Sequence, residues 1–199
     1  MFKWQSAKWL PLLNKREEML ELPEGFLRGF SIVVAHDDKL GIGKSECIPW
    51  HVPEDLRHFK EVTTTQVEGK FKPVVIMGMS TWYSINSRPL PGRENVVVSR
   101  KYREIAEVSS YTDLNMAISA ICRAHRCGDV FVIGGGQIYS QVLSHPALST
   151  IYATEIKGNY ECDVTIPEYR YDRFAIADAT PWLKSERGVS YRFLKYVTK

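Results

Sequence analysis

The sequence has no long apolar run, few cysteines and no concentration of one charge. No apolar run approaches the ~20 residues that a membrane-spanning helix needs, so we do not expect this chain to cross a membrane. The 4 cysteines in 199 residues are too sparse for the disulfide framework of a small secreted domain. The net charge of +3 is spread along the chain, whereas nucleic-acid binding usually demands a concentrated basic stripe. We therefore predict a reduced, cytoplasmic protein that binds neither membranes nor nucleic acid.

Three potential metal ligands lie close together in the sequence, at Cys122, His125 and Cys127. They fall inside or at the end of a helical pattern, and no fourth ligand is apparent. A structural zinc site needs four ligands. We therefore expect no metal site.

Residues 1–28 differ in pattern from the rest of the chain. Tryptophans and leucines lie among charged residues, and Pro11 and Pro23 interrupt the segment. The charges interrupt any continuous signal-peptide core, and the four glutamates at 17, 18, 21 and 24 argue against a mitochondrial presequence. We divide the chain into an N-terminal extension, 1–28, and a domain, 29–199. The extension either docks its aromatic side chains on the domain or binds a partner or a membrane surface.

From residue 29 onward, short apolar runs alternate with helical patterns, which favours one domain of the α/β class. Strands are expected at 30–35, 73–77, 95–99, 130–133, 151–156, 173–177 and 190–197. Helices are expected at 53–63, 81–85, 113–125 and 137–143. The alternation predicts a mainly parallel sheet with helices on both faces, and the strand-rich C-terminal end predicts an antiparallel edge.

Asp55 is an acid within an apolar pattern. If Pro53 opens a helix, then Val52, Leu56 and Phe59 form its buried face. Asp55 lies on about the same side. One interpretation is that Asp55 only complements the helix N-terminus. The other is that a buried carboxylate grips a flat, donor-rich heterocycle through two parallel hydrogen bonds. The residues alone leave both open.

Two turns lead from a strand through glycine into a helix, one at Gly78 and one at 134–136. Glycine lets the backbone approach a ligand closely, and the N–H groups at a helix start favour phosphate. A tight β–α connection also needs glycine, and the second turn does not match the GxGxxG fingerprint. With Ser99 and Arg100 at the end of another strand, the turns predict a ligand with several phosphates across the strand ends.

The loop from Arg88 to Arg93 is braced by two prolines and presents two arginines. Guanidinium groups held in this way suit a carboxylate, so one arginine is a candidate clamp for an acidic substrate tail. An ordinary solvated turn is the other interpretation.

From about Phe30 to the C-terminus, the chain resembles the dihydrofolate reductase family in the order and spacing of its motifs. The motifs are SIVVA, GIG, IPWHVPEDLRHFK, VIMGMSTWYSI, RPLPGREN, VVVSR, VFVIGGGQIY and IYATEI. The early motifs are especially similar to the reductase half of protozoan bifunctional reductase–synthase proteins, although no thymidylate synthase portion is present. The resemblance implies a central eight-stranded, mainly parallel sheet with an antiparallel C-terminal strand and about four flanking helices.

The resemblance also implies the activity. It implies an NADPH-dependent enzyme, expected to be a monomer, that reduces 7,8-dihydrofolate to 5,6,7,8-tetrahydrofolate for one-carbon metabolism and for thymidylate and purine synthesis. Two other functions compete with this activity. One is that of a related reductase of the riboflavin-pathway type, which would be expected to lack Asp55. The other is that of a catalytically inactive folate- or nucleotide-binding protein. The intact acid, threonine and arginine of the family motifs argue against the inactive protein.

The resemblance implies a role for each matching residue. Asp55 would bond the 2-amino and N3 positions of the pterin, with Thr154 in support and Trp50 as a third catalytic residue. The implied substrate-binding residues are Val33, Val34, Leu56, Phe59, Ile85, Arg88, Leu90 and Arg93, of which Arg93 would bind the glutamate tail. The implied cofactor-binding residues are Ala35, Ile42, Gly43, Ile48, Gly78, Ser80, Thr81, Ser99, Arg100, Gly134, Gly135, Gly136, Gln137, Ile138 and Tyr139. A loop that includes Ile42, Gly43 and 48–50 would close over the nicotinamide, and a cis peptide would join Gly134 to Gly135.

Two positions depart from the family pattern. Family members usually carry a basic residue where Met79 stands, and often another where Gln137 stands. Both help to bind the 2′-phosphate that distinguishes NADPH from NADH. Arg100 remains, with Lys101 beside it, so we still expect NADPH, with a weaker preference than is usual in the family.

Overall fold

The computed structural model describes residues 29–65, 71–101, 104–123, 129–169 and 172–199. The helices of the described residues are α1 (Pro53–Thr64), α2 (Met79–Ser84), α3 (Leu114–Arg123) and α4 (Gly136–Val142). The strands are β1 (Phe30–His36), β2 (Gly41–Gly43), β3 (Val74–Gly78), β4 (Glu94–Val98), β5 (Ser109–Tyr111), β6 (Val130–Val132), β7 (Leu148–Ile156), β8 (Val164–Thr165), β9 (Phe174–Ala179), β10 (Leu183–Lys184) and β11 (Ser190–Thr198).

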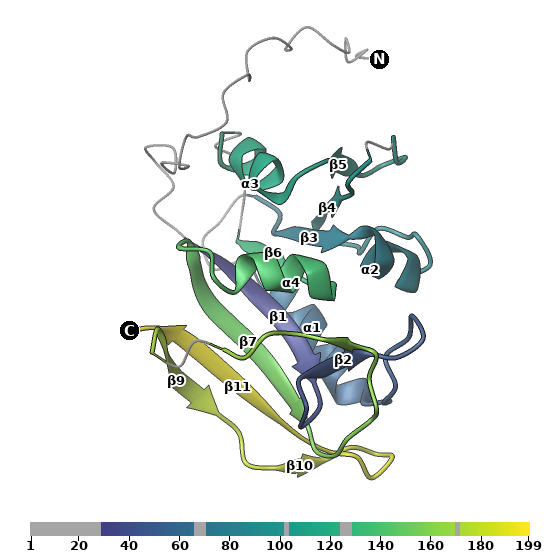
Figure 1. Ribbon diagram of the computed structural model, residues 1–199, viewed down its shortest axis with the longest axis vertical. Coiled ribbons are helices and arrows are strands. Elements are labelled where there is room, and N and C mark those ends of the chain that lie inside the picture. Colours follow the sequence, from purple (N-terminus) through teal and green to yellow (C-terminus); the bar gives the residue numbers. More distant parts are fainter. Residues whose placement is uncertain (1–28, 66–70, 102–103, 124–128, 170–171) are drawn as a thin grey trace, which may run out of the picture.

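Nine of these strands form one sheet in the order β10-β11-β7-β1-β6-β3-β4-β5, with β9 also paired to β11 (Figure 1). The pairings from β7 to β5 are parallel, and β11 runs antiparallel to β7, β9 and β10. In a parallel sheet the carboxyl ends of the strands lie at one edge, which is where ligands bind in open α/β sheets.

The central strands form because runs of valine and isoleucine suit a sheet that is covered on both faces. All five residues of β3 are buried. Side chains alternate along a strand, so Ile32 and Val34 of β1 pack with α3 and α4, whereas Val33 packs in the cluster on the face of α1 and α2. Helices therefore cover both faces of the sheet, α3 and α4 on one face and α1 and α2 on the other.

The expected fold is confirmed, with a difference in the number of strands. Each strand and helix predicted from the sequence is present within a few residues of its predicted bounds. The sheet has nine strands rather than eight, and β5 and β10 were not predicted. These two strands have only 3 and 2 residues, which is too short to show the period of two that indicates a strand.

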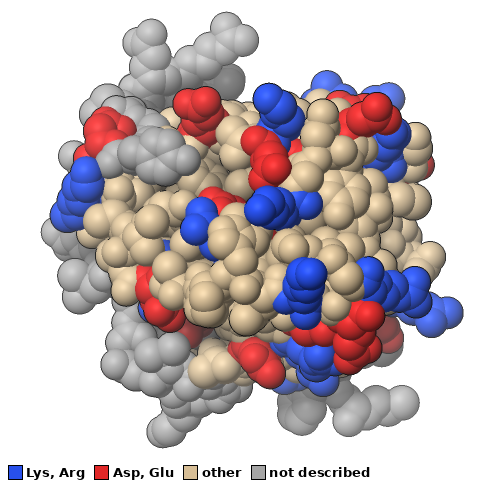
Figure 2. All heavy atoms as spheres, turned by 90° about the horizontal axis from the view of Figure 1, so that it is seen from below, with Lys and Arg blue, Asp and Glu red and all other residues tan. Residues whose placement is uncertain are grey.

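The charged side chains on the surface are dispersed, as the sequence predicts. Lysines and arginines are interspersed with acids on the face that Figure 2 shows. Within the described ranges, no helix is both long and apolar enough to cross a bilayer, and no group of His, Cys, Asp and Glu could hold a metal ion. The predictions for the extension 1–28, and for the side chains of Cys122, His125 and Cys127, lie outside the described residues.

Candidate active site

A cleft of about 1120 Å³ opens at the carboxyl ends of β1, β3, β4 and β6. The sheet brings these strand ends together although they are far apart in the sequence. The predicted site residues that line the cleft are Val33, Val34, Ala35, Ile42, Gly43, Ile48, Asp55, Gly78, Ser80, Thr81, Ser99, Arg100, Gly134, Gly135, Gly136, Gln137, Ile138 and Tyr139. The phosphate-type turns and the acid thus belong to one cavity.

The structure does not place the other predicted site residues in the lining of this cleft: Trp50, Leu56, Phe59, Ile85, Arg88, Leu90, Arg93 and Thr154. Phe59, Ile85 and Leu90 pack against the cluster that contains Val33, so they adjoin one wall of the cleft.

The predicted burial of Leu56 is wrong, because its side chain is 57% exposed. Val52, the residue just before α1 and four positions before Leu56, is 4% exposed. Val52 packs in a cluster with Trp50, Ile156 and Tyr191, and this cluster does not reach Leu56. Only part of the predicted apolar face is therefore covered.

Asp55 meets Thr154 where α1 passes over β7. The Oγ1 of Thr154, a buried residue, donates a hydrogen bond of 2.6 Å to Oδ1 of Asp55. Burial raises the pKa of Asp55, and the hydrogen bond from Thr154 partly opposes this rise. The arrangement gives a carboxyl group with an enhanced affinity for protons at the wall of the cleft, where it can pair with hydrogen-bond donors of a ligand.

The two glycine turns contact each other. The N–H of Gly78 donates to the carbonyl of Gly134 at 2.8 Å, and the peptide bond between Gly134 and Gly135 is cis, as the resemblance implies. Gly134 has a φ of +127°, and a Cβ there would lie 3.0 Å from Oγ1 of Thr81. Neither α2 nor α4 has a side-chain cap at its N-terminus, so backbone N–H groups remain available at the cleft.

The lining of the cleft carries charges of both signs. Among the described residues that line the cleft, the cations are Arg100 and Lys101, and the carboxylates are Glu46, Asp55 and Asp113. The Oδ1 of Asp113 accepts hydrogen bonds from the N–H groups of residues 115 and 116, as an N-cap of α3. The position of Asp113 before a helical pattern could have indicated this cap, but not its place in the cleft.

Arg93 is buried and hydrogen-bonded, whereas Arg88 is exposed. Arg93 is 8% exposed, its Nη1 donates to Oγ1 of Thr63 at 2.7 Å, and its guanidinium lies 5.7 Å from the centre of the Phe59 ring. Asn95 holds the loop through bonds to both Leu90 backbone groups. Burial lowers the pKa of Arg93. Such a partly desolvated cation can bind a carboxylate more strongly than an exposed one.

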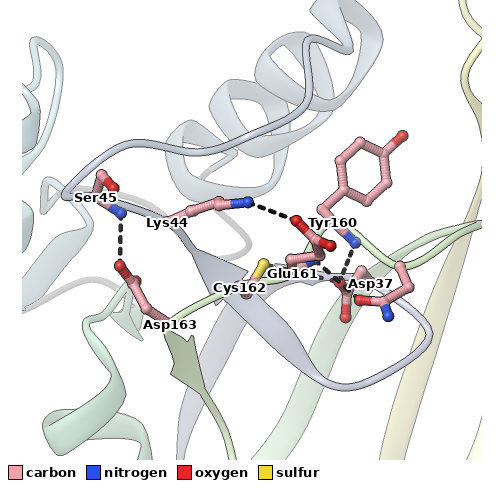
Figure 3. A network of polar contacts seen from close by, with 8 residues as sticks. Asp37, Lys44, Ser45, Tyr160, Glu161, Cys162 and Asp163 are labelled. Carbon is pink, nitrogen blue, oxygen red and sulfur yellow. Dashed lines mark hydrogen bonds and ion pairs between the residues drawn. The ribbon is translucent and has the colours of Figure 1, made fainter.

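A network of polar contacts, which the sequence did not predict, fastens the loop that carries β2 to the loop after β7 (Figure 3). Asp37 is 1% exposed and accepts hydrogen bonds from the N–H groups of Gly41 at 2.9 Å and Tyr160 at 2.9 Å. Burial raises the pKa of Asp37, but the backbone hydrogen bonds outweigh it and hold the pKa below its usual value.

The same two loops are joined by two further contacts. Nζ of Lys44 lies 3.0 Å from Oε2 of Glu161, and the N–H of Ser45 donates to Oδ2 of Asp163 at 2.8 Å. The partners are more than 100 residues apart in sequence, so no local pattern could have indicated them. The contacts hold Ile42 and Gly43 at the mouth of the cleft.

Comparisons with known proteins agree with this geometry. The family model for dihydrofolate reductase matches residues 29–198. The chain is 36% identical over 183 residues to a bifunctional dihydrofolate reductase-thymidylate synthase of Zea mays, covering 85% of this chain and 34% of that protein. A protein of the same description from Daucus carota is 39% identical over 183 residues, with the same coverage. The chain therefore spans about a third of the length of these relatives.

Two further proteins match over nearly their whole length. A dihydrofolate reductase of Neisseria gonorrhoeae is 35% identical over 170 residues, covering 85% of this chain and 98% of that protein. The fold is similar to that of an Enterococcus faecalis dihydrofolate reductase solved in complex with NADP(H) and RAB-propyl, with a TM-score of 0.74, 24% identity and coverage of 86% and 96%. The chain belongs to the dihydrofolate reductase family.

Proposed function

We propose that this chain reduces 7,8-dihydrofolate to 5,6,7,8-tetrahydrofolate with NADPH as the hydride donor. The observation that carries the proposal is the Asp55–Thr154 pair at the wall of a cleft that also contains the glycine turns. The carboxylate suits the 2-amino and N3 positions of a pterin, because two parallel donors match its two oxygens.

The cleft residues fit a dinucleotide cofactor. A Cβ at Gly136 would lie 2.8 Å from Cγ1 of Val164, so the backbone comes close to β8 and leaves no space for a side chain. The backbone of 134–136, with Ser80 and Thr81, would hold the pyrophosphate. When bound, NADPH supplies the hydride that passes from nicotinamide C4 to pterin C6.

Asp55 orients and polarises the pterin, and does not deliver the proton to N5 directly. In the proposed binding mode its carboxylate would face the 2-amino end of the ring, so water would carry the proton to N5. The buried indole N–H of Trp50 has no hydrogen-bond partner among the described residues. Trp50 is therefore a suitable donor to hold such a water. Arg93 would bind the α-carboxylate of the glutamate tail, with Phe59 and Leu90 beside it.

A spectrophotometric assay of NADPH oxidation tests the proposal. The purified chain should oxidise NADPH only when dihydrofolate is present, and tetrahydrofolate should accumulate in equal amount. Tight binding of both ligands without oxidation would instead favour a catalytically inactive folate- or nucleotide-binding protein. Activity with a riboflavin-pathway pyrimidine substrate and none with dihydrofolate would favour the related reductase.

Replacing Thr154 with valine should shift the pH dependence of turnover. The hydrogen bond from Thr154 lowers the pKa of Asp55, so its loss lets the pKa rise further. In kcat/KM against pH, the limb that reports Asp55 should move to higher pH. Thr150→Val, a threonine on the same strand that lines a different cavity, is the control and should leave the profile unchanged. A profile unchanged in Thr154→Val would contradict this coupling.

The preference for NADPH over NADH should depend on Arg100 and Lys101, the two cations that line the cleft, since Met79 adds no charge there. A charge-assisted hydrogen bond to the 2′-phosphate contributes about 1.5–3 kcal/mol, which is about tenfold or more. Arg100→Ala should therefore lower kcat/KM for NADPH about 10- to 100-fold, and Lys101→Ala by a smaller factor, with little change for NADH. Lys184→Ala, in β10, is the control. Equal kcat/KM for both cofactors in the unaltered protein would overturn the assignment of NADPH.

We further propose a cytoplasmic monomer in which residues 29–199 form the reductase domain and 1–28 a separate extension. The start of the family match at residue 29 supports this division. Size-exclusion chromatography with light scattering should give a mass near 22.8 kDa. A dimer mass would contradict the monomer.

A further inference from the structure

Asp37 follows directly on β1 and is a buried acid that the proposed function does not use. Although burial raises its pKa, the backbone hydrogen bonds outweigh this effect and keep the pKa below its usual value. The carboxylate is therefore charged at neutral pH, and both of its oxygens can only accept hydrogen bonds. A buried charge is costly unless donors surround it, so the donors around Asp37 indicate which parts of the chain it holds together.

The two oxygens of this carboxylate serve different segments of the chain. Oδ1 accepts hydrogen bonds from the N–H groups of Lys39 at 2.8 Å and Gly41 at 2.9 Å, which belong to its own turn. Oδ2 accepts one from the N–H of Tyr160 at 2.9 Å, in the loop after β7 (Figure 3). The thiol of Cys162 lies 3.7 Å from the same oxygen. Asp37 thus joins a turn to a loop that lies 123 positions away in the sequence.

Tyr160, whose backbone Asp37 holds, packs on Trp50. The two rings meet edge to face, with centroids 5.3 Å apart and planes at 72°. Cys162 packs against the same buried cluster as Trp50. An edge-to-face contact depends on the relative position of the two rings, so a shift of the Tyr160 backbone would alter the contact with the indole. The carboxylate is therefore one aromatic contact away from Trp50.

The indole N–H of Trp50 is a group whose orientation matters for turnover. It is buried and has no hydrogen-bond partner among the described residues, and in the proposed function it holds the water that carries a proton to N5. A hydrogen bond weakens steeply when its donor is turned away from the acceptor. The contact with Tyr160 can supply the correct orientation of this donor.

We propose that Asp37 is a positioning residue for the reduction: it fixes the backbone at Tyr160, and the ring of Tyr160 in turn fixes the indole of Trp50. Asp37 does not line the cleft, so it acts on turnover through this series of contacts. The inference rests on the role that the proposed function gives to Trp50, and it adds to that role a residue outside the cleft.

Asp37→Asn tests the proposal, because an amide has the shape of the carboxylate but only one oxygen. That oxygen can face the turn or the N–H of Tyr160, and not both. We expect kcat for dihydrofolate reduction to fall about tenfold while KM for both ligands stays within about twofold, since a small misplacement of a catalytic group lowers the rate and not ground-state binding. The backbone amide of Tyr160 should exchange its hydrogen at least about tenfold faster, as measured by NMR in deuterium oxide.

Asp38→Asn is the matched control. Asp38 is the adjacent, exposed carboxylate, and its Oδ2 accepts a hydrogen bond from the N–H of Gly158 at 2.8 Å, which an amide oxygen can also accept. In this variant, kcat and the exchange rate at Tyr160 should both stay within about twofold of the unaltered values.

A second variant, Tyr160→Ala, removes the ring and keeps the backbone N–H. It should lower kcat about as much as Asp37→Asn does. If Asp37 acts through this ring, the variant that carries both substitutions should lose no more kcat than either single variant.

The results that would overturn this inference differ from those that would overturn the proposed function. Faster exchange at Tyr160 with an unchanged kcat in Asp37→Asn would make the contact only structural. Losses of kcat that add in the double variant would mean that Asp37 acts by another route. Unchanged kcat in Tyr160→Ala would also contradict the inference, whether or not Asp37→Asn folds. An unaltered chain without dihydrofolate reductase activity would instead contradict the proposed function, and exchange at Tyr160 would still report whether Asp37 fixes this backbone.

Discussion

Replacing Asp55 with asparagine is expected to lower kcat for dihydrofolate reduction by about 100-fold or more at neutral pH, without unfolding the protein. The amide oxygen still accepts the hydrogen bond from Thr154, so the local geometry is preserved. The negative charge that pairs with the pterin is lost. Steady-state kinetics beside circular dichroism measure the two effects separately. A kcat near that of the unaltered enzyme would remove Asp55 from the mechanism.

Glu54→Gln is the matched control, because Glu54 is the adjacent carboxylate in the first turn of α1 and does not line the cleft. Its kcat should stay within about threefold of the unaltered value, since the carboxylate of Glu54 contacts Arg57 and the N–H of Glu186 and not the cleft. An equal loss in both variants would mean that the helix, and not the carboxylate at Asp55, supports turnover.

The same Asp55→Asn variant should be less active than the unaltered protein at neutral pH but more stable, and the difference in stability should depend on pH. Burial raises the pKa of Asp55 above its ordinary value of 3.8, so the unfolded chain loses this proton at lower pH than the folded protein. Ionisation therefore costs stability as pH rises from about 3.8 through the raised pKa. Asparagine avoids this cost, so the variant should have the higher Tm at neutral pH, and the difference should vanish near pH 3.5. A lower Tm for the variant at neutral pH would contradict the burial of the charge.

Replacing Gly134 with alanine is expected to impair both folding stability and cofactor binding. The φ of +127° is strained for any residue with a Cβ, at a cost of about 1–3 kcal/mol, and the new methyl would lie 3.0 Å from Oγ1 of Thr81. Relief of this contact must move the turn that lines the cleft. We expect Tm to fall by about 4–10 °C. The Kd for NADPH, measured by fluorescence quenching, should rise at least about tenfold.

Gly188→Ala separates the two causes. Gly188 has a φ of +79°, but a Cβ there would meet no atom within 4 Å, and it lies outside the cleft. It should therefore lower Tm through backbone strain and leave the Kd for NADPH unchanged. If Gly134→Ala behaved in the same way, the contact with Thr81 would have no part in cofactor binding.

Much of this fold follows from local patterns. The apolar runs of β3, β4 and β6 are strands because valine and isoleucine suit a sheet covered on both faces, and Pro53 marks the start of α1 as predicted. The same patterns failed for β5 and β10, whose few residues pair because their neighbours hold them in place. They also failed for Leu56, because a helical face predicts which residues share a side and not how far the covering layer extends.

The sequence by itself determined the class of fold, the family, and the residue types of the site: an acid in an apolar helix, glycine turns after strands, and an arginine loop. These depend on local periodicity, on backbone preferences and on ordered motifs, all of which can be recognised along a single chain. Only the tertiary structure decided which partners these residues have. Thr154 reaches Asp55 across 99 positions, and Tyr160 reaches Asp37 across 123. Such contacts arise from the order of strands in the sheet, and no local pattern encodes that order.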